Sequence, residues 1–183
     1  AAKRPHDVNI LTIDVEDWYD LSGQQIRGHG VPRPDILARQ LDRLLELLAR
    51  HRTRATFFCL GGSLQHAPEL VRRIATAGHE LGTHGWAHEP IARVGLAAFR
   101  DDLQKSIAWL QDQTGQAIRG YRAPAFSVAP HQLDEFYDIC LEAGWTFRRW
   151  TEFAEIDSWL ATTLRAWREG DGTRGDCQCD EGN

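Results

Sequence analysis

The 183-residue sequence lacks methionine altogether, which indicates a processed chain or a piece of a longer one. No apolar run approaches the roughly 20 residues that a transmembrane helix requires, so we expect no membrane span. The first residues lead into a strand-like run and not into a signal-peptide core, which favours a cytoplasmic location. Together these absences are typical of a chain that neither crosses a membrane nor carries its own export signal.

Cysteine and clustered positive charge are also scarce. Four cysteines in a chain of this length do not make a disulfide framework. Cys59 and Cys140 fall in apolar segments, where buried free thiols are expected. Cys177 and Cys179 stand in a polar tail without a second pair downstream, which argues against a metal site there. The net charge is -5 and the basic residues are scattered, so nucleic acid is not an expected partner.

Short β-rich runs alternate with segments of helical periodicity. We expect strands at 8–13, 55–60, 80–82 and 117–121, and helices at 35–50, 68–77, 96–113 and 131–143. This alternation predicts an α/β fold with parallel strands joined by right-handed crossovers. Both (β/α) barrels and doubly wound sheets are built in this way, and periodicity does not choose between them. The pattern degrades after residue 147, which predicts an organised domain over 1–147 and a divergent or truncated tail over 148–183.

Polar residues follow three of the expected strands, at the strand ends where ligands bind in such folds. The first group is acidic, the second holds two histidines and the third holds an arginine: Asp14, Glu16 and Asp17; His84 and His88; Arg122. Two histidines four residues apart can bind one metal ion from one face of a helical turn, although Gly82 and Gly85 argue against a regular helix. An arginine before a proline-stiffened loop can orient a carboxylate. The combination predicts one pocket that collects all three groups.

These segments resemble a known family in their order and spacing. Residues 12–18 (TIDVEDW), 83–88 (THGWAH) and 122–124 (RAP) look like the first three motifs of the polysaccharide deacetylases, the NodB homology domain of carbohydrate esterase family 4. The Asp-Val-Glu-Asp form resembles the branch found beside bacterial exopolysaccharide gene clusters. The resemblance covers about residues 8–147, and it includes a Thr-Phe-Phe strand at 56–58.

The resemblance implies a fold and an activity. The fold would be a distorted (β/α) barrel of the NodB type, incomplete at its C-terminus in this chain. The activity would be hydrolysis of N-acetyl groups on the amino sugars of an N-acetylated oligo- or polysaccharide. Family members use a bound divalent metal for this reaction, usually Zn²⁺.

The resemblance also implies roles for individual residues. His84 and His88 would bind the metal together with one carboxylate. Asp14 would be the general base, Arg122 would hold it in place, and the backbone N–H of Ala125 would help to bind the oxyanion. Most members have two adjacent acids, whereas this chain places Val15 between them. Strand alternation puts Glu16 on the same side as Asp14, so we prefer Glu16 as the third ligand and keep Asp17 as the alternative.

The chain departs from the family in its histidines. The family's general acid is a histidine in a late motif, whereas all eight histidines here lie at or before residue 131. This difference favours a truncated or replaced C-terminal segment. It also favours a second hypothesis, a catalytically impaired or carbohydrate-binding relic that keeps the metal ligands. Hydrolysis of a small cyclic amide, and iron(II) oxygen chemistry on the same ligand set, are further alternatives.

Overall fold

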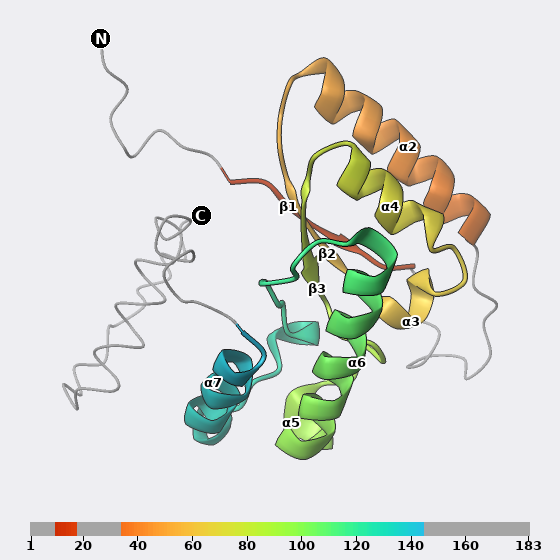
Figure 1. The fold of residues 1–183 in the computed structure, drawn as a ribbon. Coiled ribbons are helices and arrows are strands. Elements are labelled where there is room, and N and C mark those ends of the chain that lie inside the picture. Colours follow the sequence, from red (N-terminus) through yellow and green to blue (C-terminus); the bar gives the residue numbers. More distant parts are fainter. Residues whose placement is uncertain (1–9, 18–33, 145–183) are drawn as a thin grey trace, which may run out of the picture. The chain divides into compact units, whose positions relative to one another are not determined.

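The structure is a computed structural model that describes residues 10–17 and 34–144. These residues belong to one compact unit, Asn9–Trp145. Strands and helices alternate along it as expected (Figure 1), in the order β1 (Thr12–Val15), α2 (Pro34–Arg50), β2 (Thr56–Cys59), α3 (Gly61–Leu64), α4 (Glu69–Thr76), β3 (Glu80–Thr83), α5 (Ile91–Val94), α6 (Leu96–Thr114) and α7 (Leu133–Glu142). The expected tail, with Cys177 and Cys179, lies outside the described residues.

The three strands form a parallel sheet in the order β1-β2-β3. Each strand therefore lies beside the next one in the sequence. An isolated parallel bridge between Thr83 and Tyr121 continues the same order beyond β3. Doubly wound sheets reverse their strand order at a switch point, whereas barrels keep it sequential. Within the described residues the order is therefore that of a barrel, the fold expected from the motifs.

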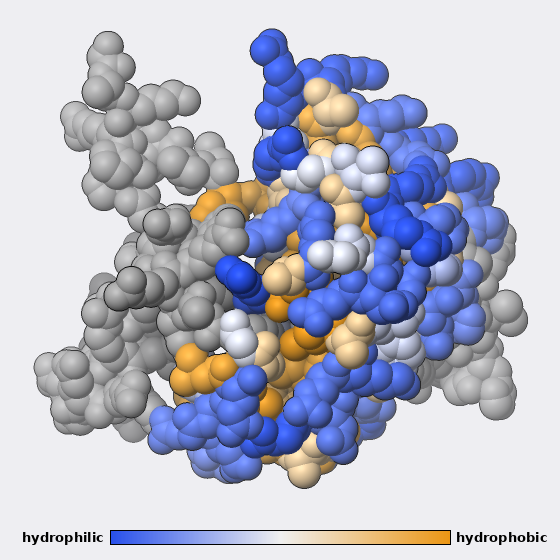
Figure 2. Space-filling view, in the orientation of Figure 1, coloured by the Kyte–Doolittle hydropathy of each residue, from blue (hydrophilic) through white to orange (hydrophobic). Residues whose placement is uncertain are grey.

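Helices α2, α4 and α6 lie side by side on one face of the sheet (Figure 1). Alternate strand residues point toward them, and Phe57, Cys59 and Leu81 are almost wholly buried there. The helices contribute their apolar faces to this core, with the side chains of Leu41, Leu48, Leu70, Val71, Ile74, Leu103 and Leu110. On the face of the molecule seen in Figure 2 the helices present mostly hydrophilic residues, and hydrophobic ones show between them. None of the described helices is long and apolar enough to cross a membrane.

The opposite face of the sheet is more polar. The register pairs Asp14 with Phe58 and Phe58 with Gly82, so these three positions share that face. The Phe58 ring lies directly over Gly82, where a Cβ atom would come within 2.7 Å of it. Glycine at position 82 therefore leaves room for the Phe58 ring.

Several elements differ from the sequence-based expectations. The sequence predicts a buried first strand over 8–13, but β1 runs from Thr12 to Val15 and only Val15 is buried. Thr12 and Asp14 lie on the polar face, and Ile13 packs partly buried against the core. The expected strand at 117–121 is present only as the bridge at Tyr121. The sequence does not predict helices α3 and α5. Cys59 and Cys140 are free and buried, as predicted.

Candidate metal centre

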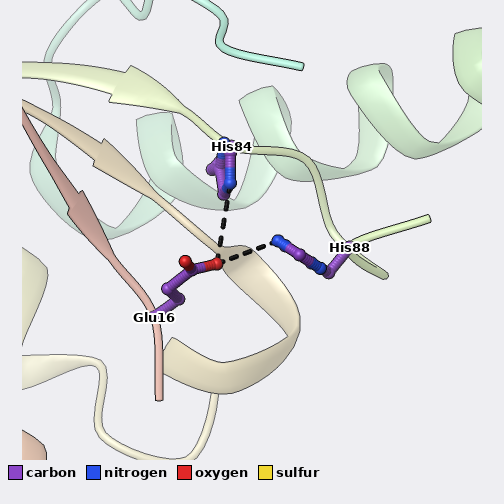
Figure 3. A group of neighbouring side chains, drawn as sticks. All are labelled: Glu16, His84 and His88. Atoms are coloured by element: carbon purple, nitrogen blue, oxygen red, sulfur yellow. Dashed lines mark ion pairs between the residues drawn. The ribbon is translucent and has the colours of Figure 1, made fainter. Parts of the chain in front are cut away.

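Three side chains converge at the C-terminal edge of the sheet (Figure 3). Glu16 directly follows β1, His84 directly follows β3, and His88 lies in the loop that leads to α5. Glu16 Oε2 lies 3.0 Å from His88 Nε2 and 3.6 Å from His84 Nε2. One potential ligand atom from each of the three residues lies within 4.8 Å of the other two. The structure thus brings together both motif histidines and the carboxylate preferred from the sequence.

The hydrogen bond of His84 determines which of its ring nitrogens faces the group. His84 Nδ1 lies 2.8 Å from the carbonyl oxygen of Arg122. A carbonyl only accepts, so Nδ1 carries the proton, and Nε2 of the neutral ring presents a lone pair. Burial lowers the pKa of His84, while Asp14 and Glu16 act in the opposite direction and His88 adds to the lowering. A histidine that ligates a metal is typically held in this way, with its other N–H donated to a carbonyl.

Glu16 Oε2 is a buried oxygen that accepts no hydrogen bond from any described residue. The lone pairs of this carboxylate oxygen and of His84 Nε2 face each other over 3.6 Å and repel one another unless a cation lies between them. Two imidazole nitrogens and one carboxylate oxygen are the protein ligands of many catalytic zinc sites, which keep a further position open. The residues present therefore fit a divalent metal.

Asp17, the alternative third ligand, is also buried, with 7% of its surface exposed. It is not part of the group of potential ligands that the described residues form. The geometry thus favours Glu16 over Asp17, and the assignment of the ligands stays a prediction.

Asp14 and Arg122 form an ion pair beside this group. Arg122 Nη1 donates to Asp14 Oδ1 over 2.7 Å, and Nη2 donates to Thr12 Oγ1 over 2.6 Å. The guanidinium also lies over the Phe58 ring, with Cζ 4.3 Å from the ring centroid. Two hydrogen bonds and a stacked ring hold the planar guanidinium, and through it the Asp14 carboxylate, in one orientation.

Thr12 is not among the residues that the sequence singles out. Its hydroxyl accepts from Arg122, and it stands two positions before Asp14 on β1. Strand alternation places residues two apart on the same face, so the pattern that links Asp14 to Glu16 also points to Thr12. A threonine in a strand, however, usually indicates only β-propensity.

Two positions at this site have a left-handed backbone. Among the described residues only three non-glycine residues have a positive φ, and two of them are His88 (φ 56°) and Ala125 (φ 52°). Ala125 lies in the short turn Pro124–Phe126, and its N–H makes no hydrogen bond within the described part of the chain. Such conformations cost free energy and cluster at functional sites. The Ala125 N–H therefore has no acceptor among the described residues, and its role as a donor to the oxyanion stays a prediction.

Comparison with known proteins agrees with the geometry. The sequence profile of the polysaccharide deacetylase family matches residues 32–135, a range that includes His84, His88, Arg122 and Ala125. The chain is 39% identical over 103 residues to the peptidoglycan deacetylase of Helicobacter pylori, covering 52% of this chain and 35% of that protein. It is 33% identical over 91 residues to a peptidoglycan-N-acetylglucosamine deacetylase of Bacillus cereus, covering 50% of this chain and 33% of that protein. The chain thus spans about a third of the length of each of these relatives.

Solved structures show the same fold. A mutant of a CE4 family pseudoenzyme from Bacillus anthracis, with restored enzymatic activity, superposes with a TM-score of 0.57 at 26% identity. The match covers 74% of this chain and 42% of that one. The described part of this chain therefore has the α/β fold of NodB-type domains. Since the family profile matches more than half of the sequence, the chain belongs to the polysaccharide deacetylase family.

Proposed function

We propose that this chain is a metal-dependent hydrolase that removes N-acetyl groups from the amino sugars of an oligo- or polysaccharide. The observation that carries the proposal is the convergence of Glu16, His84 and His88 on one point, beside the ion pair of Asp14 and Arg122. The names of the relatives support the substrate class, since both are peptidoglycan deacetylases. The exopolysaccharide branch suggested by the Asp-Val-Glu-Asp form is part of the same proposal.

Glu16, His84 and His88 would hold the metal, for which we propose zinc. When bound, such an ion supplies Lewis acidity, which lowers the pKa of a water molecule by several units, toward about 7, and polarises the amide carbonyl. The chain's contribution is to fix three metal-ligating atoms, two imidazole nitrogens and one carboxylate oxygen, in a mostly buried position. Only 4% of the His84 side chain, 11% of His88 and 12% of Glu16 are exposed.

Asp14 would accept the proton of the attacking water. Its carboxylate lies on the polar face of the sheet, two residues before Glu16 on the same strand end, and about a third of the side chain is exposed. Arg122 holds one of the two carboxylate oxygens, so the other can take the proton. The two acids of the motif therefore have different roles, because Glu16 binds the metal and Asp14 moves a proton.

The Ala125 N–H would donate to the oxyanion that forms when water adds to the amide carbon. Backbone donors fixed before the reaction stabilise developing negative charge without a cost of reorganisation. The turn Pro124–Phe126 closely follows Arg122, so the donor and the residue that orients the base are placed by one segment.

The test is acetate release from N-acetylglucosamine oligomers, measured together with zinc content. Wild-type protein should release acetate and should lose activity on treatment with a chelator. Asp14→Asn should abolish turnover and keep the zinc, whereas His84→Ala should lose both. His66→Ala, at an exposed histidine outside the group, is the matched control and should behave as wild type. Loss of zinc in Asp14→Asn would mean that base and ligand are exchanged.

A second candidate function is that of a relic that binds metal and carbohydrate without turnover. All eight histidines of the sequence lie at or before residue 131, so these 183 residues hold no late histidine of the kind that the family resemblance implies as general acid. One of the similar solved structures also derives from a pseudoenzyme. Zinc binding without acetate release would support this candidate, and acetate release would exclude it. Release from a small cyclic amide alone would instead indicate an amidase.

A further inference from the structure

The segment that carries both candidate histidine ligands, residues 84–88, is not helical. Gly85 has a φ of 85° and His88 has a φ of 56°. Glycine adopts a positive φ readily, so Gly85 suits its position. For His88, as for any other L residue with a side chain, a positive φ is unfavourable. The spacing between the two imidazoles therefore depends on contacts that hold this backbone from outside.

Asp102, on helix α6, provides two of these contacts. Its Oδ1 accepts a hydrogen bond from the Trp86 N–H over 2.7 Å, and its Oδ2 accepts one from the Ala87 N–H over 2.8 Å. Both oxygens of one carboxylate are thus engaged by consecutive backbone donors between the two histidines. Hydrogen bonds to an ionised acceptor are the stronger kind, and the bidentate arrangement fixes direction as well as distance.

Ser106, one helical turn after Asp102, hydrogen-bonds to Gly85, the loop residue before Trp86. Its hydroxyl donates to the carbonyl oxygen of Gly85 over 3.0 Å, and the Gly85 N–H donates to Thr83 Oγ1 over 3.0 Å. The hydroxyls of Ser106 and Thr83 are also in hydrogen-bond contact, and both residues are fully buried. A buried polar network in which every member is satisfied is rigid and specifies one conformation.

Position 85 also shows how closely helix α6 approaches the loop. A Cβ atom there would lie 2.8 Å from Asp102 Oδ1. Glycine is therefore required twice, by its backbone conformation and by the approach of the carboxylate. The contact with Asp102 therefore restricts position 85 of the loop to glycine.

We propose that Asp102 is a positioning residue of the metal centre, which sets the location of His88 relative to His84. It lies outside the three sequence motifs and outside the group of potential ligands formed by the described residues. The inference rests on the proposed function in one respect, that the two histidines bind a metal. Groups that hydrogen-bond directly to a metal ligand typically contribute 10- to 100-fold to metal affinity, and we expect an effect of that order from Asp102, which holds the backbone between the two histidines.

The test is the zinc affinity of the full chain, measured by competition with a chromophoric chelator at pH 8. Asp102→Asn keeps one acceptor oxygen but turns an amide N–H₂ toward a backbone N–H, and Asp102→Ala removes both acceptors. We expect zinc affinity to fall about 10-fold in Asp102→Asn and about 100-fold in Asp102→Ala. Asp101→Asn, a change of the same kind at the exposed neighbouring residue on α6, should leave the affinity unchanged.

A second control separates positioning from a general loss of stability. Ile107→Val shortens a buried side chain on the same helix and should lower the stability of the metal-free protein without changing its zinc affinity. Unfolding of each variant in a chelator checks that it is folded.

The outcomes distinguish this inference from the proposed function. If wild type binds zinc and both Asp102 variants bind it equally well, the positioning role is wrong and the proposed function stands. The same holds if zinc affinity follows stability across all variants, including Ile107→Val. If wild type binds no zinc, both proposals are wrong.

Discussion

Replacing Glu16 by glutamine should stabilise the metal-free protein and at the same time remove its zinc binding. The change is nearly isosteric, so packing is kept. Only 12% of the Glu16 side chain is exposed, and its buried Oε2 accepts no hydrogen bond from the described residues. At pH 8 the His84 imidazole is neutral, because the ordinary pKa of histidine is about 6.5 and burial lowers that of His84 further. The carboxylate then faces the lone pair of His84 Nε2, since the proton of that ring is on Nδ1.

The size of the effect follows from this missing partner. A buried acceptor without a hydrogen bond costs about 1–3 kcal/mol, and more when it is charged. The amide of a glutamine at position 16 carries no charge, so the part of this cost that comes from burying a charge is removed. We therefore expect the free energy of unfolding to rise by about 1–2 kcal/mol. For a domain of this size that corresponds to an increase in Tm of about 2–8 °C.

The assay is thermal unfolding at pH 8, with a chelator and with excess zinc. Wild-type Tm should rise with zinc, because a ligand that binds only the folded state stabilises it, by about 2.7 kcal/mol at 100 times Kd. Glu16→Gln should start higher in chelator and respond little to zinc. Glu80→Gln is the control: this exposed carboxylate already accepts a hydrogen bond from Thr56, so its Tm should change little. A Glu16→Gln variant that is less stable than wild type in chelator would refute the reasoning.

Three further predictions concern the surroundings of the site. Gly62→Ala should destabilise the protein by about 1–3 kcal/mol in urea unfolding, because the added Cβ would overlap the carbonyl oxygen of Trp86. Arg122→Lys should lower kcat/KM for deacetylation about 10-fold or more and spare zinc affinity, since an ammonium cannot make both of its hydrogen bonds and stack as well. Burial lowers the pKa of His79, so its contribution to stability is present above pH 6.5 and is lost as the pH falls below that value. Between pH 7.5 and 5.5 in chelator, wild type should lose more stability than His79→Gln, by no more than about 1.4 kcal/mol per pH unit.

The sequence predicted the fold best where periodicity is strong. The helix expected over 35–50 is α2, and the apolar run at 55–60 contains β2, buried at all four positions. Helices α3 and α5 have four residues each, too few to show a helical period. Gly61 and Gly62 begin α3, and their N–H groups donate to the Gly85 and Trp86 carbonyls. The start of α3 is therefore fixed by hydrogen bonds to a distant loop, and the residues near α3 in the sequence do not reveal them.

The candidate site divides in the same way. Glu16, His84, His88, Asp14 and Arg122 could be singled out because each stands at a strand end, where parallel strands bring their termini together. Thr12 and Asp102, which support these residues, could not be singled out from the sequence. An aspartate on a helix usually indicates a solvated face, and the contact of Asp102 with the loop joins residues 15 and 16 positions apart. Which side chains support a site depends on how helices pack, and the sequence pattern carries that information only weakly.

The central claim is that Glu16, His84 and His88 hold one metal ion. The most direct test is the zinc content of the purified full chain, compared with that of a His84→Ala, His88→Ala double variant, by elemental analysis after dialysis. We predict one zinc ion per chain in wild type and none in the double variant, with both proteins folded by circular dichroism. Equal zinc content in the two proteins would contradict the account.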